Sequence, residues 1–108
     1  MEKLIGKFIV SANAFDAKTI LSLFSLNAVI DDVSVGKTFK GASGVREYFE
    51  EYFVGYHTAT KLDSIEVLDD RHAKAQVDFT GDFGHEKGVL DVTTDTAGLI
   101  IKIEAWLL

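Results

Sequence analysis

The stretch Asn27–Phe53, NAVIDDVSVGKTFKGASGVREYFEEYF, decides the fold and carries the first candidate for a functional residue. It predicts a strand that ends at Asp31–Asp32, a tight turn at Val35–Thr38, a short return strand and an amphipathic helix that opens at Gly41–Gly44. The turn depends on its glycine, because glycine tolerates a positive φ. Neighbouring strand residues point to opposite faces, so only one of the two aspartates can face the interior, and strand parity favours Asp32.

The residues before this stretch predict two helices. From Glu2 to Phe15, apolar residues recur at the i, i+3, i+4 spacing of a helix with one buried face. Asp16 is predicted to cap a second, short helix, because its carboxylate can accept the free N–H groups of the first turn. That helix is expected to end at Asn27. Its predicted buried side consists of Ile20, Leu21, Leu23 and Phe24.

The residues after this stretch predict strands, because apolar and polar residues alternate from Thr58 onward. Two helices, a strand pair and a third helix followed by a strand meander predict a single α+β domain over residues 1–108, with helices on the concave face of a curved antiparallel sheet. The expected strands, turns and loop are strands at 61–68, 73–83, 90–95 and 99–108, turns at 69–72 and 95–98, and a loop at 84–88.

Length, charge and cysteine content exclude several classes of function. A chain of 108 residues fits one domain. A formal net charge of −6 argues against nucleic acid and against an anionic membrane surface. The absence of cysteine excludes disulfides and thiolate metal sites. Gly6 and Lys7 interrupt the first apolar run, and no run approaches the ~20 residues of a membrane span, so we expect a cytoplasmic protein without a signal peptide.

The order and spacing of three motifs resemble those of the NTF2-like superfamily, in its SnoaL-like and ketosteroid-isomerase-like branch. The resemblance covers nearly the whole chain and implies a cone-shaped α+β fold. It also implies a pocket between the sheet and the helices, and frequent homodimerisation through the outer sheet face. The residues that carry it are Asp16, Phe24 and Asn27–Asp32, then Phe39–Gly41 with Gly44–Phe49, and last Asp95–Ile100.

The resemblance implies a catalytic role for an acid on the first strand, which falls on Asp32. In ketosteroid isomerases an aspartate base works with an oxyanion hole made of a tyrosine and a protonated aspartate. The position of that tyrosine falls on Phe8, and the position of that aspartate falls on Leu90. Because both donors are missing, we do not expect a ketosteroid isomerase.

Two interpretations remain open for each candidate catalytic residue. Asp32 is either a general base in an apolar cup, with burial available to raise its pKa, or a polar strand residue that meets water or a backbone N–H. His57, at the junction of helix and strand, either acts with Asp32 or is an exposed loop histidine. Asp82, His85 and Glu86 fall at a hairpin tip, where a solvated turn is favoured over a metal site. No metal and no cofactor is predicted.

The apolar sets that face inward predict a pocket for a small apolar organic ligand. Tyr48, Tyr52 and Tyr56 repeat at i+4 and either bring hydroxyls to the pocket mouth or pack in the core, which is the favoured interpretation. The predicted ligand-binding residues are Phe8, Tyr48, Phe49, Tyr52, Phe53, Phe79, Leu90, Val92 and Ile103, with Ala12 and Ala105 also lining the pocket.

Two functions follow from these observations. The first is an isomerase, cyclase or dehydratase that uses Asp32 as its base, and the second is a non-catalytic ligand-binding or dimerisation module. On the closing strand, Ile100, Trp106 and Leu108 are expected to share the outer face. Large exposed apolar groups mark interaction sites, so a homodimer centred near Trp106 is predicted, with a monomer as the alternative.

Overall fold

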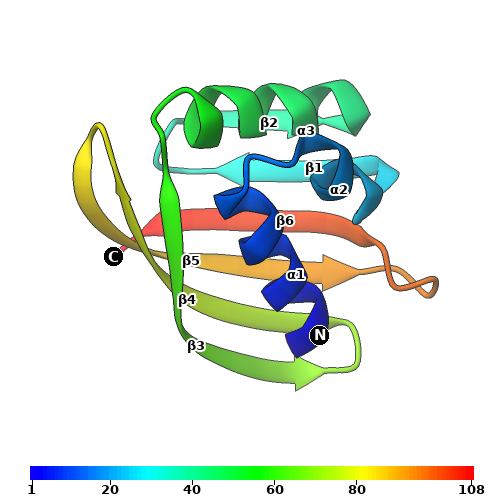
Figure 1. The fold of residues 1–108 in the computed structure, drawn as a ribbon. Helices are drawn as coiled ribbons and strands as arrows, with labels where there is room; N and C mark the ends of the chain where they lie inside the picture. The colour runs from blue at the N-terminus through cyan, green and yellow to red at the C-terminus, as the bar shows by residue number, and fades with distance from the viewer.

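A computed structural model describes residues 1–108 (Figure 1). Three helices and a turn of π-helix combine with six strands. In chain order the elements are α1 (Glu2–Asn13), α2 (Ala17–Ser22), β1 (Phe24–Asp32), β2 (Lys37–Lys40), α3 (Gly41–Phe49), η1 (Glu50–Val54), β3 (Ala59–Asp69), β4 (His72–Gly81), β5 (Gly84–Thr94) and β6 (Ile100–Leu107).

The six strands form one curved sheet in the order β2-β1-β6-β5-β4-β3, and the helices pack on one face of it (Figure 1). This arrangement confirms the α+β class. The sheet is mixed rather than wholly antiparallel, because β6 inserts beside β1 and runs parallel to it. All other neighbours are antiparallel. No helix is long and apolar enough to cross a membrane.

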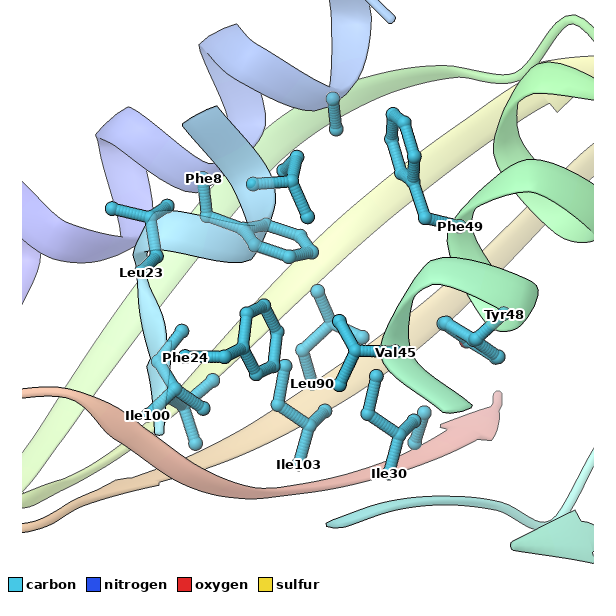
Figure 2. Close-up of a cluster of buried hydrophobic side chains, with 14 of the residues drawn as sticks. Phe8, Leu23, Phe24, Ile30, Val45, Tyr48, Phe49, Leu90, Ile100 and Ile103 are labelled. Atoms are coloured by element: carbon cyan, nitrogen blue, oxygen red, sulfur yellow. The ribbon is translucent and has the colours of Figure 1, made fainter. Parts of the chain in front are cut away.

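The core lies where α1 and α3 cover the sheet. Figure 2 shows Phe8, Phe24 and Val45 converging with Leu90 and Ile103 from the sheet. The period of α1 buries Ile5, Phe8, Ile9 and Ala12 against the sheet as one continuous cluster, as predicted. Phe15 is an exception, because α1 ends at Asn13 and the Phe15 side chain is exposed. Burying a side chain of this size contributes about 1.5–3 kcal/mol, which makes this cluster the main source of stability.

The second helix is shorter than the sequence predicts. Asp16 caps it as expected, because its side chain accepts the backbone N–H of Thr19 at 3.1 Å. The helix ends at Ser22, and Phe24 already belongs to β1, so Asn27 lies inside a strand and does not end the helix. The backbone N–H of Ile100 donates to the carbonyl of Leu23 at 2.9 Å, which ties this segment to the sheet at once.

The predicted loop at 84–88 is part of a strand. Gly84 opens β5 with a φ of 104°, and Asp82 and Phe83 alone form the turn. The ladder pairs Glu86 with Phe79 and Gly88 with Val77. Charged residues hide the alternation here, because this end of the sheet extends past the helices and both of its faces can meet water.

A further correction concerns the start of β6. The ladder pairs Thr93 with Lys102 but Thr94 with Ile100, so β6 carries one extra residue, which forms a bulge. The bulge turns Ile100 into the core, where it is 1% exposed. Ile100 therefore does not share the outer face with Trp106, as strict alternation had predicted.

The third helix continues into a turn of π-helix. After α3 the chain widens into η1, where the N–H of Gly55 donates to the carbonyl of Glu50 at 2.8 Å. Single π turns of this kind are rare and often lie at functional sites. The start of α3 also lies close to β2. A Cβ atom added at Gly44 would lie only 2.9 Å from the backbone of Phe39, so this position requires glycine.

Candidate functional site

A cavity of about 250 Å³ is lined mainly by residues from the end of β1, from α3 and η1, and from the β4–β5 hairpin. Figure 1 shows this hairpin curling up on the side of the sheet where η1 leads into β3. The cavity volume lies just below the ~300–1,000 Å³ typical of small-ligand pockets. Its lining is mainly aromatic, with a small set of polar groups. The lining residues are Asp32, Ser34, Val35, Tyr48, Tyr52, Phe53, Tyr56, Thr58, Phe79, Phe83, Glu86 and Leu107.

Asp32 is the most buried acid of the chain, at 6% exposure, and its side chain reaches the cavity from the end of β1. Strand parity turns it inward and leaves Asp31 half-exposed, as predicted. The carboxylate accepts three hydrogen bonds. The hydroxyl of Tyr48 donates to Oδ2 at 2.6 Å, and the hydroxyl and backbone N–H of Ser34 donate to Oδ1 at 2.6 and 2.9 Å.

The local sequence explains this geometry. An aspartate side chain readily accepts the backbone N–H two residues later, and here that turn begins where β1 ends. The carbonyl of Asp32 also accepts the N–H of Gly36 at 3.0 Å, so the turn holds the residue from both sides. Gly36 has a φ of 66°, which fits the glycine predicted for this turn.

Tyr48 is a hydrogen-bond donor that keeps its proton. Burial raises the pKa of Tyr48 well above its usual value, and the negative charge of Asp32 and their hydrogen bond raise it further. The phenol therefore stays neutral at physiological pH and donates to the carboxylate. A charge-assisted bond of this length is among the stronger hydrogen bonds found in proteins.

A chain of aromatic rings runs from the buried carboxylate to the cavity mouth. The ring of Tyr48 lies 5.5 Å from that of Tyr52, which lies 5.9 Å from Tyr56, which lies 6.0 Å from Phe83. Exposure increases along this chain, since Tyr48 is buried, Tyr52 is half-buried, and Tyr56 and Phe83 are exposed. Burial, with smaller contributions from Glu51 and Tyr56, raises the pKa of Tyr52, so its hydroxyl is also a neutral donor.

The structure divides the predicted ligand-binding residues into two groups. Tyr48, Tyr52, Phe53 and Phe79 line the cavity. The others are packed into the core, because α1 and the start of α3 cover that end of the sheet and leave no space above it (Figure 2). The predicted lining residues that belong to the core are Phe8, Ala12, Phe49, Leu90, Val92, Ile103 and Ala105.

His57 lies outside the cavity. It follows η1 with a φ of 53°, is mostly exposed, and its Nδ1 lies 2.9 Å from Oδ2 of Asp82. It is not among the lining residues, so the structure does not bring it together with Asp32. The two aligned positions where ketosteroid isomerases carry donors hold the core residues Phe8 and Leu90, which cannot donate.

The acids and histidines of the β4–β5 hairpin do not gather into one site. Asp82 faces His57, while His85 pairs with Asp78 across the outer face of the sheet. No group of three or more histidine, cysteine or acidic side chains is close enough to hold a metal ion. Glu86 faces the other way and lines the cavity.

Several lining residues escaped prediction. Ser34 could have been inferred from the Asp-x-Ser turn. Phe83, Glu86 and Leu107 depend on how far the hairpin curls toward η1, which alternation does not encode. Tyr56 was identified at i+4 from Tyr52 but was assigned to packing. The π turn keeps it beside the mouth.

No protein-family model and no curated protein matches this sequence. Solved structures do match in fold. A candidate polyketide cyclase from Sinorhizobium meliloti superimposes with a TM-score of 0.86 at 15% identity, covering 95% of this chain and 93% of that one. SalBIII, an epoxide hydrolase/cyclase-like enzyme of pyran ring formation in the polyether salinomycin, superimposes with a TM-score of 0.86 at 19% identity, covering 99% and 89%.

A third match is RV0760c from Mycobacterium tuberculosis, in complex with estradiol-17beta-hemisuccinate. It has a TM-score of 0.84 and 18% identity, and the match covers 94% of this chain and 88% of that one. Other matches are described as NTF2-like or cystatin-like. Identities this low establish the fold and nothing of the chemistry. The chain therefore has the NTF2-like, cystatin-like fold that its sequence resemblance implied.

Proposed function

We propose that the protein binds a small, largely apolar organic molecule in the aromatic cavity and that Asp32 accepts a proton from it. The observation that carries this proposal is a buried carboxylate at the inner end of an apolar cavity, held in place by three donors. A carboxylate held in a cleft is a candidate general base, because it can lie within hydrogen-bond reach of the proton that it accepts from a bound ligand.

The hydrogen-bond pattern leaves Asp32 able to react. A carboxylate has about four acceptor positions, and the structure fills three of them. Both bonds from Ser34 go to Oδ1, while Oδ2 receives Tyr48 alone, so the remaining position belongs to Oδ2. Tyr52 and Tyr56 also line the cavity, and their hydroxyls are donors for a ligand oxygen in place of those missing at Phe8 and Leu90.

The structural neighbours support the ligand class only in a general way. Among them are a candidate polyketide cyclase, an epoxide hydrolase/cyclase-like enzyme and a protein in complex with a steroid derivative. Each handles a molecule with fused or closing rings. The proposal extends to this chain the size and apolar character of such ligands. The specific reaction of a ketosteroid isomerase is excluded from it, because the donors at Phe8 and Leu90 are missing.

Proton abstraction can be measured directly with 2-tetralone, a small fused-ring ketone with acidic α-protons. In D₂O, proton NMR follows the loss of the α-proton signal with and without protein. Wild-type protein should accelerate the exchange, and Asp32→Asn should lose the acceleration. Asp31→Asn is the matched control, because it removes a neighbouring charge that does not line the cavity.

A non-catalytic ligand-binding module is the second candidate function. The half-open mouth favours it, because Tyr56 and Phe83 leave the cavity accessible to water, which weakens a base. This candidate predicts that 2-tetralone stabilises the protein in a thermal-shift experiment, while exchange stays at the rate of the Asp32→Asn variant. No thermal shift and no exchange together would contradict both candidates.

A homodimer through the outer sheet face remains part of the proposal. Trp106 lies there near Ile65, Val89 and Leu108, and the polar residues Ser64, Glu66, Lys74 and Gln76 line the same surface. Light scattering at micromolar concentration should show a dimer, and Trp106→Glu should give a monomer. A monomeric wild type or a dimeric variant would contradict this interface.

We also propose that residues 1–108 act as one domain and work in the cytoplasm. The continuous core is consistent with a single domain, and the net charge of −6 is consistent with a protein that does not bind anionic membrane surfaces. Fractionation of cells that produce the full chain would test it, and recovery with the membrane fraction would contradict it.

A further inference from the structure

All the charged residues that line the cavity are acidic. Asp32 and Glu86 both line it, and no lysine, arginine or histidine does. The basic group whose charge reaches Tyr52 belongs to Lys37, which is held outside by a 2.8 Å ion pair with Glu47. Both partners of that pair are about half-exposed. The negative charge of the cavity therefore has no balancing cation among the lining residues.

Aromatic rings form most of the remaining wall. Six of the lining residues are aromatic, and the centroids of neighbouring rings are spaced 5.5–6.2 Å apart along the wall. The face of an aromatic ring is the negative end of its quadrupole, so a cation within about 6 Å of a ring centroid is attracted. A cavity this narrow brings any guest within that distance of several rings.

The open acceptor position of Asp32 adds a directional contact. Its fourth lone-pair position lies on Oδ2, beside the bond from Tyr48. Tyr48, Ser34 and the backbone N–H of Ser34 already donate to the carboxylate, so what the site lacks is one more donor and a positive charge. A protonated amine supplies both in one group.

We propose that the ligand of this cavity carries a protonated amine on a flat apolar body, with the ammonium beside Asp32 and the body between the aromatic walls. This inference names the class of ligand and rests on the ligand-binding part of the proposed function, not on proton transfer to Asp32, because the ammonium would occupy the acceptor position of Oδ2. Glu86, at the mouth, favours the same charge during entry. An anionic ligand meets two carboxylates and no cation, and a neutral ligand fills the acceptor position without using the charge of the lining.

Three probes with one naphthalene body test the charge preference at pH 7. They are 2-naphthylmethylamine, which is a cation, 2-naphthalenemethanol, which is neutral, and 2-naphthoate, which is an anion. Calorimetric titration should show the amine binding at least about fivefold tighter than the alcohol, and the carboxylate binding at least about tenfold weaker than the alcohol. The preference for the amine should shrink as salt concentration rises.

Two variants locate the effect. Glu86→Gln should reduce the ratio of amine to alcohol affinity about two- to threefold. Glu2→Gln makes the same charge change on α1, away from the cavity, and should leave the ratio unchanged. Asp32→Asn should remove most of the preference. It keeps an acceptor oxygen for Ser34, and circular dichroism checks that the variant folds.

The outcomes separate the two proposals. Equal affinity for amine and alcohol, or tighter binding of the carboxylate, overturns the inference while ligand binding stands. Failure of all three probes to bind overturns both. An equal loss of preference in Glu2→Gln and Glu86→Gln also overturns the inference, because net charge rather than the cavity would then be the cause. Exchange of 2-tetralone is an independent measurement and can fail alone.

Discussion

The two ends of the concave sheet face are built from the same strands and have opposite character. At one end, under α1 and α3, small and aliphatic sheet residues such as Leu90 and Ile103 meet Phe8 and Phe24, and the space is filled (Figure 2). At the other end the strands extend past α1 and the start of α3, and Phe79 lines a cavity together with Phe53 of η1. The difference teaches that coverage by helices, rather than strand alternation, decides which inward residues form the core.

The amino acids follow that division. Alanines at 73, 75 and 105 let the helices approach the sheet closely at the filled end. Large rings stand at the open end, where Phe79 of the sheet meets Phe53 of η1 at a ring distance of 6.2 Å. Gly88 contributes to the same arrangement, because a side chain there would meet the ring of Phe79 at 3.2 Å. The local sequence therefore shapes the cavity, because Gly88 has no side chain and a neighbouring position in the sheet, Phe79, has a large one.

Truncation at the filled end should have the largest effect. Ile103→Ala removes a side chain that is 2% exposed and leaves a void that the packed helices cannot close. We expect a loss of about 2–5 kcal/mol in the free energy of unfolding, measured by urea denaturation. Phe79→Ala, at the open end, should cost clearly less despite its larger side chain. Equal losses would show that the cavity wall is ordinary core.

Removing the buried donor should have the next largest effect. Tyr48→Phe deletes the hydroxyl that binds Oδ2 of Asp32 and leaves that oxygen buried with no protein donor. The expected cost is about 1–3 kcal/mol in the free energy of unfolding. Tyr56→Phe is the control, because the Tyr56 hydroxyl is at the exposed end of the aromatic chain. A cost in Tyr48→Phe no larger than in the control would mean that the bond adds nothing.

The raised pKa of Tyr48 predicts a loss of stability in alkali. Between the usual tyrosine pKa of about 10 and its higher value in the folded protein, the unfolded chain loses the proton while the folded chain keeps it. Stability from this group is complete below about pH 10 and falls above it, by at most about 1.4 kcal/mol per pH unit. Urea denaturation at pH 8, 10 and 11 should show this fall, and Tyr48→Phe should show a smaller one. Parallel curves for the two proteins would contradict the assignment.

Truncation at the cavity mouth should have the smallest effect on stability. Phe83→Ala removes an exposed ring, so the free energy of unfolding should change by no more than about 0.5 kcal/mol. The affinity for 2-naphthalenemethanol should nevertheless fall, because the ring ends the aromatic chain beside Tyr56. A large loss of stability without a loss of affinity would mean that Phe83 belongs to the core.

The sequence was sufficient for the presence of three helices and the orientation of Asp32, because each depends on local period or parity, although it placed the end of α2 too late in the chain. It was not sufficient for features that depend on tertiary contacts. The bulge that buries Ile100 and the parallel pairing of β1 with β6 depend on contacts between segments far apart in the chain. Phe8 and Ile103 were expected at the pocket, because helical period and strand alternation show which side chains face inward. Neither pattern shows whether the space in front of those side chains is filled by other residues.

The most direct test of the division is a map of ligand binding along the concave face. Amide NMR spectra of labelled protein, recorded while 2-naphthalenemethanol is added, report on both ends at once. We predict the largest shifts around Ser34, Tyr52 and Phe83, with Phe24 and Ile100 unchanged. Shifts centred on the filled end or on the outer face near Trp106, or no shifts at all, would contradict the account.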